Sequence, residues 1–384
     1  MEYGCIGKKL PHSFSKVIHE KFGKYPYELL ELTEQELTGF MTERPFKAIN
    51  VTIPYKEAVI PFLYHMSEKA AEIGAVNTVI NKDGRLYGYN TDFYGMSALI
   101  EKSGVSIKDK KVAVLGSGGT SKTAFSVANA LGASQVIRVG RKEKDSCITY
   151  ESLYENHADT QVIIKTTPVG MFPEIYACPV DIDRFSDLCL VVDAVYNPLN
   201  TMLVSKAKEK GITAVGGLYM LISQAVKAYE LFTESEAEPG LTDTVYSGIY
   251  SEKSNIVLAG MPSCGKTTAG KALAQKLNRE FIDTDDEIIK KIGMPIAEYF
   301  KKYGEKSFRD TESEVIKEIS KRSGVVIATG GGAVLRKENV EKLKMNGVIY
   351  FIDCPLSCLG PTSDRPLASD MQAMKKIYDE RHET

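Results

Sequence analysis

The stretch KVAVLGSGGTSKTAFSVANALGASQVIRVGR, residues Lys111–Arg141, decides the fold class of this chain. Val112–Leu115 is an apolar run that predicts a buried strand, and Thr120–Leu131 has the spacing of a helix. The glycines between them predict a turn, and Gln135–Val139 is predicted as the next strand. Strand and helix patterns alternate in this way along most of the chain. This alternation predicts α/β layers around mainly parallel sheets.

The alternation continues through the middle of the chain and then breaks once. Three more short apolar runs are predicted as strands: 162–165, 190–193 and 212–215. Tyr219–Phe232 carries its apolar residues on one face of a predicted helix. The polar stretch that follows has weak periodicity and contains Pro239-Gly240, so we predict a linker over 236–253. The alternation restarts at Asn255.

Composition limits the class of protein. The chain has 384 residues, of which 43% are hydrophobic, enough for two or three domains with real cores. Its 48 basic and 50 acidic residues form no long like-charge block, so neither nucleic acid nor a membrane surface is an expected partner. The sequence shows no bilayer-spanning apolar run and no signal peptide. Seven scattered cysteines without a CxxC pair predict reduced thiols in the cytoplasm, and five dispersed histidines show no metal-ligand spacing.

The first glycine-rich turn predicts a dinucleotide site. Gly116, Gly118 and Gly119 lie between a predicted strand and a predicted helix, whose amino terminus can hold a pyrophosphate. The next predicted strand is followed by Arg141 and Lys142, where NAD-binding proteins carry an acidic residue for the ribose diol. Two cations there favour the 2'-phosphate of NADP, with ordinary surface cations as the alternative.

A second glycine-rich turn, GMPSCGKTT at Gly260–Thr268, matches the phosphate-binding loop of nucleoside triphosphate enzymes. Glycines let successive backbone N–H groups turn toward phosphate oxygens. Lys266 adds a mobile positive charge, and the Thr267 hydroxyl can ligate Mg²⁺. A strand pattern precedes the loop and a helix pattern follows it. The motif predicts a triphosphate but does not name the acceptor.

Downstream residues are candidates for the acceptor site. Asp283 and Asp285 stand two apart after a short apolar start, so on a strand end they could share one face. Arg309 and Glu312 are three apart, which is one helical turn. The glycine run 330–332 ends a predicted strand where backbone can approach a ligand closely. Taken singly, each feature is more often an ordinary surface feature.

Polar residues in the first hundred positions predict a pocket for a polyhydroxylated ligand. Lys56 and Asp92 form a plausible acid–base pair for carbonyl-to-alcohol chemistry, with plain surface positions as the alternative. The other polar candidates lie between strand-like apolar residues: Ser13, Ser15, Thr52, Asn77 and Asn90.

The ordered set GxxxxGKT, DTD, GExxFRxxE, GGG and RPL over Asn255–Thr384 resembles shikimate kinase. The resemblance implies that Lys266 and Thr267 handle the ATP phosphates and Mg²⁺, and that Asp283 helps hold the metal. It implies that Asp285 orients the attacking hydroxyl of shikimate. Arg309 and Arg381 are expected to bind the shikimate carboxylate, with help from Gly331. Arg365 is expected to come from a lid that closes over the phosphates. In the family, more chain follows the position of Arg381, so a kinase domain over 254–384 is expected to be truncated at its carboxyl terminus.

The motifs HSxS, NVTxPxK, GAVNTV, NTDxxG, GxGG, TTPVGM and GGLYMLISQA resemble shikimate dehydrogenase from Met1 to about Thr233. The resemblance implies a substrate domain over 1–95 and 216–235 and a Rossmann-type NADP domain over 96–215. Lys165 stands where the family usually has asparagine, and Gly140 replaces another expected asparagine. The implied shikimate contacts are Ser13, Ser15, Thr52, Lys56, Asn77, Asp92, Tyr196 and Gln224.

The two resemblances together predict a fusion in which one half makes shikimate and the other phosphorylates it. The alternatives are a quinate/shikimate dehydrogenase using NAD, and a dehydrogenase with an inactive, regulatory or nucleotide-sensing kinase half. The oligomeric state stays open. The predicted NADPH contacts are Gly116, Gly118, Gly119, Thr120, Ser121, Arg141, Lys142 and Gly217. The predicted MgATP contacts are Gly260, Pro262, Ser263, Cys264, Gly265, Lys266, Thr267, Thr268, Asp283 and Arg365.

Overall fold

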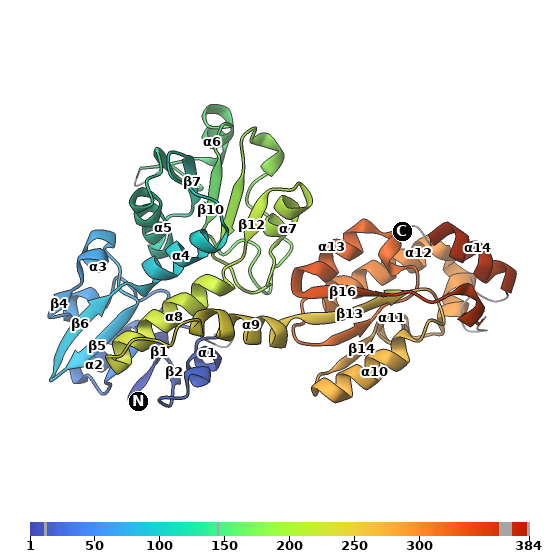
Figure 1. Cartoon of the computed structure of the whole chain (residues 1–384), viewed down its shortest axis with the longest axis horizontal. Helices are drawn as coiled ribbons and strands as arrows, with labels where there is room; N and C mark the ends of the chain where they lie inside the picture. The colour runs from blue at the N-terminus through green and yellow to red at the C-terminus, as the bar shows by residue number, and fades with distance from the viewer. Residues whose placement is uncertain (11–13, 144–145, 361–370, 382–384) are drawn as a thin grey trace. The chain divides into compact units, whose positions relative to one another are not determined.

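The computed structural model describes residues 1–10, 14–143, 146–360 and 371–381 (Figure 1). The chain divides into two compact units. Unit 1 comprises Met1–Asn197 and Thr201–Ile249, and unit 2 comprises Pro198–Asn200 and Tyr250–Thr384. Among the helices described, none has the length and apolar character needed to cross a membrane.

Unit 1 begins with a mixed six-stranded sheet in the order β2-β1-β3-β5-β6-β4. Strands β1, β2 and β3 pair in parallel, whereas β5 is antiparallel to both β3 and β6. Helix α2 starts at a capping box in which Thr33 and Glu36 satisfy each other's backbone N–H groups. The elements are β1 (Tyr3–Gly7), α1 (Ser15–Phe22), β2 (Glu28–Glu31), α2 (Glu34–Glu43), β3 (Ala48–Val51), β4 (His65–Met66), α3 (Glu68–Ile73), β5 (Thr78–Lys82) and β6 (Arg85–Tyr89).

The second sheet of unit 1 has six parallel strands in the order β12-β11-β10-β7-β8-β9. Five of its strands correspond to the predicted ones, whereas the two-residue strand β9 was not predicted. Strands β7, β10 and β11 are buried along nearly their whole length, which explains their continuous apolar runs. The chain leaves β7 toward β8 on one side and returns to β10 on the other, which makes a switch point between β7 and β10. The elements are β7 (Lys111–Leu115), α5 (Gly119–Ala130), β8 (Gln135–Val139), β9 (Cys147–Ile148), α6 (Tyr150–Asn156), β10 (Val162–Lys165), β11 (Leu190–Asp193), α7 (Met202–Glu209) and β12 (Thr213–Val215).

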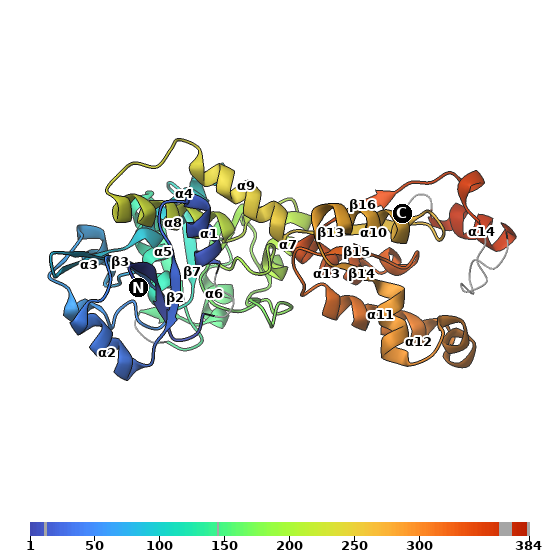
Figure 2. The ribbon, with the colours of Figure 1, turned by 90° about the horizontal axis from the view of Figure 1, so that it is seen from below.

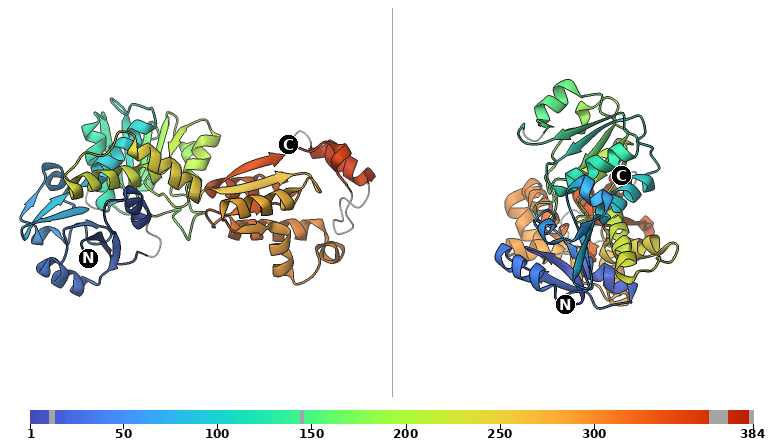
Figure 3. Two further views of the ribbon diagram at one scale, coloured as in Figure 1. Left: turned by 60° about the horizontal axis from the view of Figure 1, so that its bottom comes forward. Right: turned by 90° about the vertical axis from the view of Figure 1, so that its left-hand side faces the viewer.

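Helices α4 (Thr91–Lys102) and α8 (Leu218–Thr233) pack against each other between the two sheets of unit 1 (Figures 1 and 3). Gly95 allows this close approach, because a Cβ atom at that position would lie 2.5 Å from the Met220 carbonyl oxygen. The two helices therefore connect the mixed sheet to the parallel sheet.

The segment predicted as a linker contains helix α9 (Leu241–Lys253). Its first part belongs to unit 1, since Val245 and Ile249 are buried. The Tyr246 ring meets Tyr219 of α8 edge to face at 5.3 Å, and Asp243 pairs with Lys102 of α4 at 2.8 Å. Polar composition hid this helix, because only two of its residues are buried apolar ones.

Unit 2 is built on a parallel sheet in the order β14-β15-β13-β16. Helix α10 lies on the face of Leu258, where Gly270 approaches the Phe281 ring, while α11, α12 and α13 pack on the face of Val257 (Figure 2). Helix α12 is kinked at Gly304, whose φ is 81°. The elements are β13 (Asn255–Gly260), α10 (Lys266–Leu277), β14 (Phe281–Asp283), α11 (Thr284–Ile292), α12 (Ile296–Ile319), β15 (Val326–Ala328), α13 (Lys337–Asn346), β16 (Gly347–Ile352) and α14 (Met371–Arg381).

Candidate active sites

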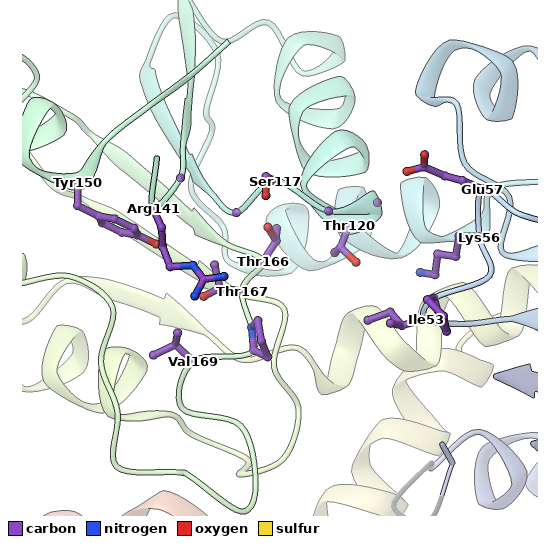
Figure 4. Close-up of a pocket in the computed structure, with 16 residues that line it drawn as sticks. Ile53, Lys56, Glu57, Ser117, Thr120, Arg141, Tyr150, Thr166, Thr167 and Val169 are labelled. Atoms are coloured by element: carbon purple, nitrogen blue, oxygen red, sulfur yellow. The ribbon is translucent and has the colours of Figure 1, made fainter. Parts of the chain in front are cut away.

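A cavity of about 570 Å³ opens at the carboxyl edge of the parallel sheet of unit 1, at the switch point (Figure 4). The turn after β7 and the loop after β10 form two of its walls, and Ile53 to Glu57 form a third. Gly116 has φ 130°, and a Cβ there would lie 2.5 Å from the Thr166 hydroxyl. Only glycine therefore lets the two loops meet. Helix α5 begins at this cavity, because Gly119 and Thr120 of its first turn are among the lining residues.

Five predicted dinucleotide contacts line this cavity: Gly116, Gly118, Gly119, Thr120 and Arg141. Ser121 lies beneath the turn instead, where its hydroxyl donates to the Gly116 carbonyl at 2.7 Å. Lys142 is exposed and is not among the lining residues. Sequence reasoning missed Tyr150 and Glu57, which also line the cavity. Figure 4 shows Tyr150 beside Arg141 at one end and Lys56 at the other end.

An adjoining cavity of about 270 Å³ is lined by most of the predicted substrate residues. Gly217, predicted for the cofactor, also lines it. Ser13 lies outside the described residues. Cys5 and Asn50 line this space too. Asn50 opens the motif NVTxPxK but was not among the predicted contacts, and Cys5 lies in none of the motifs. The predicted residues that line it are Ser15, Thr52, Lys56, Asn77, Asp92, Tyr196 and Gln224.

Lys56 and Asp92 form an ion pair between the two cavities. Lys56 lies in the turn after β3, and Asp92 lies in the first turn of α4, which Asn90 caps by accepting from the Phe93 N–H. Their side chains are 15% and 11% exposed, so the pair is largely screened from water yet open to a ligand. Burial raises the pKa of the neighbouring Cys5 thiol to about 12, which keeps the thiol neutral.

Hydrogen bonds hold the polar wall of the substrate cavity. Asn77 Oδ1 accepts from the Thr91 N–H at 2.7 Å, and Asn77 Nδ2 donates to the Thr91 hydroxyl at 3.0 Å. The Thr91 hydroxyl donates to Gln224 Oε1 at 3.3 Å, and Gln224 Nε2 donates to the Leu221 carbonyl at 2.7 Å. The network joins α4, α8 and the segment before β5. It therefore orients two predicted substrate contacts before any ligand binds.

The phosphate-binding loop of unit 2 connects β13 to α10. Gly260 has φ 150° and Gly265 has φ 86°, conformations that favour glycine. Lys266 is 5% exposed, and its Nζ donates to the carbonyls of Gly260 and Met261 at 3.0 and 2.7 Å. The lysine therefore lies folded over its own loop. The other predicted loop residues, Pro262, Ser263, Cys264 and Thr268, complete the turn and the start of α10.

The two aspartates after β14 differ from the sequence prediction. We expected Asp283 and Asp285 to share one face of a strand end, but the strand ends at Asp283, and Asp285 lies in the first turn of α11. Asp283 caps this helix by accepting from the Asp285 N–H at 3.0 Å. Its other oxygen accepts from the Thr267 hydroxyl at 2.8 Å. The cap turns one carboxylate toward the phosphate loop and leaves the other facing Gly330.

Gly330 to Gly332 bring the candidate acceptor residues together. A Cβ on Gly330 would lie 2.8 Å from Asp285 Oδ1 and 3.0 Å from Glu312 Oε1, and one on Gly332 would overlap the Arg309 guanidinium. Arg309 and Glu312, which are one helical turn apart, form an ion pair at 2.8 Å. Burial raises the pKa of Glu312, and Arg309 opposes this shift.

Gly331 fits against the phosphate loop, since a Cβ there would lie 2.8 Å from Pro262 Cδ. Arg365 lies outside the described residues. The helix α14 ends at Arg381, whose side chain also lies outside them. Within the described ranges, no three or more His, Cys, Asp or Glu side chains gather as a metal site. The two residues predicted for Mg²⁺ are neighbours, since the Thr267 hydroxyl donates to Asp283.

Comparison with known proteins identifies both halves. Residues 5–79 match the family model of the shikimate dehydrogenase substrate binding domain, and residues 262–383 match that of shikimate kinase. The chain is 37% identical over 263 residues to the shikimate dehydrogenase (NADP(+)) of Clostridium beijerinckii, covering 64% of this chain and 96% of that one. The chain belongs to the shikimate dehydrogenase family. It also carries a shikimate kinase domain and is a fusion of the two.

Solved structures agree with the dehydrogenase half. The chorismate mutase/shikimate 5-dehydrogenase fusion protein from Clostridium acetobutylicum superposes with a TM-score of 0.60 at 35% identity, covering 64% of this chain and 96% of that one. Shikimate 5-dehydrogenase from Thermus thermophilus, in complex with NADP(H) and shikimate, superposes with a TM-score of 0.58 at 28% identity, covering 65% and 99%.

The residues present fit the nucleotides that these families imply. In the dehydrogenase half, Thr167 lines both cavities, and its buried hydroxyl has no hydrogen-bond partner within the described ranges. An added Cβ on Gly118 would meet nothing within 4 Å, so the turn leaves space for a pyrophosphate. In the kinase half, the Ser263 hydroxyl is likewise buried in the phosphate loop with no described partner. Adjacent Thr267 and Asp283 oxygens are the ligand type that Mg²⁺ prefers.

Proposed function

We propose that unit 1 reduces 3-dehydroshikimate to shikimate with NADPH. The observation that carries this proposal is the Lys56–Asp92 pair, because Lys56 lines both the nucleotide cavity and the substrate cavity. A group at that junction can reach the carbonyl oxygen of a substrate whose carbon faces the nicotinamide. NADPH, when bound, supplies the hydride.

In this proposal Lys56 donates the proton that the carbonyl oxygen takes up, and its ion pair with Asp92 keeps the ammonium aimed at the substrate. Asn77 and Gln224, which the Thr91 hydroxyl links, offer polar contacts to the ring hydroxyls. A neutral, hydrogen-bonding wall suits a ligand with several hydroxyl groups. An analogue without those hydroxyls would leave the polar groups of the wall unpaired and would therefore bind less well.

NADPH rather than NADH is the proposed reductant. Arg141 lines the nucleotide cavity and follows β8 in the chain. In this fold the end of that strand meets the adenosine ribose. Guanidinium groups bind phosphates in a bidentate way, so Arg141 favours a ribose with a 2'-phosphate.

We further propose that unit 2 transfers a phosphoryl group from MgATP to the 3-hydroxyl of shikimate. In this proposal Lys266 turns from the carbonyls of its own loop to the phosphates, Thr267 binds Mg²⁺, and Asp285 accepts a hydrogen bond from the hydroxyl that is phosphorylated. Arg309 is oriented by Glu312 for the substrate carboxylate. Phosphoryl transfer depends on positioning and cationic stabilisation, which this arrangement supplies. Asp285, Arg309 and the glycine run lie next to the loop, because Gly331 packs on Pro262.

One preparation of the full chain tests both proposals. NADPH oxidation with 3-dehydroshikimate and ADP release with shikimate are measured separately. Turnover with 3-dehydroshikimate that exceeds turnover with 3-dehydroquinate, and NADPH preferred over NADH, support the first proposal. Preference for quinate and NAD supports the alternative dehydrogenase. ADP-coupled formation of a shikimate phosphate supports the second proposal, whereas nucleotide binding without product indicates a sensing or inactive kinase half.

A further inference from the structure

A fully buried ion pair lies directly behind the walls of both cavities of unit 1. Lys165 ends β10 and Asp193 ends β11, and they are neighbours in the register of the sheet. Both side chains are 0% exposed. Lys165 Nζ donates to both carboxylate oxygens of Asp193, at 2.9 and 3.1 Å. Neither residue is among those that line the two cavities, so neither is placed to act on a ligand directly.

The residues that follow this pair form cavity wall on both strands. Thr166, Thr167 and Pro168 come directly after Lys165 and line both cavities. Ala194, Val195 and Tyr196 come directly after Asp193 and line the substrate cavity. A change in the distance between the two strand ends would therefore move both walls.

Asp193 is tied to the wall by further hydrogen bonds. Its Oδ1 accepts from the Val195 N–H at 2.9 Å, and its Oδ2 accepts from the Thr201 hydroxyl at 2.6 Å. The Ala194 N–H donates to the Lys165 carbonyl at 2.9 Å. Thr201 also caps α7 by accepting from the Val204 N–H. The carboxylate thus anchors the β11 loop at two points and the β10 strand at a third.

The arrangement extends to the turn before α8. The Gly217 N–H donates to the Val195 carbonyl at 2.9 Å, and a Cβ on Gly217 would overlap the Ala194 carbonyl. Gly217 lines the substrate cavity together with Lys56. Hydrogen bonds therefore link the loops after β10, β11 and β12 next to the Lys165–Asp193 pair.

A neutral side chain at position 165 would leave the Asp193 carboxylate without its cationic partner. Burial raises the pKa of Asp193, and the Lys165 ammonium is the largest influence opposing that shift. An isolated buried carboxylate would draw in water or a proton, and either would move the loops that it anchors.

We propose that Lys165 and Asp193 are positioning residues of the dehydrogenase, which set the relative placement of the loops after β10 and β11 and hence the shape of both cavities. The proposal rests on the proposed reductase activity of unit 1. It assigns the pair a role beyond stability, and the two roles make different predictions.

The decisive variant is the double substitution Lys165→Met/Asp193→Asn in the full chain. It removes both charges, so no lone charge is buried, and the amide oxygen that replaces the carboxylate can still accept from the Val195 N–H. Thermal unfolding of the double variant is expected to return close to wild type, while each single substitution lowers the unfolding temperature. We expect kcat/KM for 3-dehydroshikimate to stay at least about tenfold below wild type and the Kd for NADPH to rise. Recovery of kcat/KM along with stability would overturn the proposal.

Two further variants keep the test decisive. Thr201→Val preserves both charges and removes one anchor of Asp193, so a smaller fall in kcat/KM is expected; an unchanged value would overturn the proposal. Lys111→Met is the control, because Lys111 pairs with Asp159 at 2.6 Å at the amino-terminal end of β7 in the same sheet, and neither residue lines either of the two cavities. It should leave kcat/KM and NADPH affinity unchanged.

NADPH affinity separates this inference from the proposed function. It is followed by the fluorescence of the nucleotide itself, in a chain that has no tryptophan. If the wild type does not reduce 3-dehydroshikimate, the proposed function fails. A raised Kd for NADPH in the double variant would still support the positioning role, and an unchanged Kd would overturn it.

Discussion

Replacing Lys56 by methionine tests the proposed proton donor most directly. Methionine keeps most of the side-chain volume and removes the ammonium. A positioned general acid contributes roughly 10²–10⁴-fold to a rate, which corresponds to about 3–5 kcal/mol of the barrier. We therefore expect kcat for 3-dehydroshikimate reduction to fall by about that factor. NADPH affinity should fall much less, although Lys56 also lines the nucleotide cavity.

The same substitution should lower stability by an amount set by the burial of the pair. Removing one partner of a fully buried ion pair costs about 3–5 kcal/mol. The Asp92 side chain is 11% exposed, so water can partly solvate it, and we expect about 2–3 kcal/mol. Lys102→Met is the control, because Lys102 and Asp243 are 49% and 56% exposed, and loss of such a solvated pair should lower stability far less.

The assay follows NADPH absorbance at saturating substrate, below the unfolding temperature of each variant. Asp92→Asn and the double variant complete a cycle, and residues that act as one unit give losses that do not add. Lys56→Arg keeps the charge but scarcely gives up a proton, so it should be nearly as slow as Lys56→Met. If Lys56→Met keeps kcat within about tenfold of wild type, well short of a general acid's contribution, Lys56 is not the proton donor.

Three further predictions concern the other features of the chain. Lys266→Ala should abolish ADP-coupled phosphorylation of shikimate and leave the dehydrogenase rate unchanged; a parallel fall in both rates would contradict independent sites. Gly332→Ala should raise the KM of the kinase for shikimate by roughly tenfold, because the new Cβ would displace the Arg309 guanidinium, and an unchanged KM would argue against Arg309 as a shikimate contact. Burial lowers the pKa of His19 to about 3, below its unfolded value, so folding stability is lost as pH falls below about 6.5. Between about pH 7.5 and 5.5 the His19 contribution should lower the free energy of unfolding by about 1.4 kcal/mol, measured by chemical denaturation. His19→Phe should remove this pH-dependent loss from the unfolding of unit 1.

The parallel sheet of unit 1 could be predicted from the sequence because its strands are buried on both faces. Burial on both faces demands continuous apolar runs, and Val112–Leu115 and Leu190–Val192 show that pattern. The candidate substrate residues could be proposed for another reason. They lie in ordered motifs that resemble a known family, and the structure brings those that it describes to one cavity, apart from Asn90, which caps α4 instead.

Helix α9 and the aspartates after β14 could not be predicted from local patterns. The helix has few apolar residues, and it packs on α4 and α8 through the Tyr246 ring and the Asp243 carboxylate. Asp285 follows a strand in sequence, but Asp283 caps a helix that begins at Thr284. For α9 the deciding contacts are with residues that are distant in sequence. For the aspartates the deciding interaction is a helix cap that competes with continuation of the strand.

The Lys165–Asp193 pair shows the same limit at the level of one residue. The sequence shows lysine where the resemblance leads us to expect asparagine, and nothing near position 165 compensates for its charge. The compensating carboxylate is 28 residues away and becomes a neighbour only through the parallel pairing of β10 and β11. Contacts of this kind depend on sheet order, which periodicity does not encode.

The two candidate sites use different cations for reasons that follow from their proposed chemistry. A proton donor must be able to lose its proton, and a lysine can do so when its surroundings change, whereas an arginine stays charged. Lys56 therefore suits the reductase site, where the substrate oxygen takes up a proton. Arg309 suits the kinase site, where a carboxylate must be held at constant charge, and its pairing with Glu312 fixes the direction of the guanidinium. Both sites would bind the same small molecule, but only the first needs its cation to change protonation state during turnover.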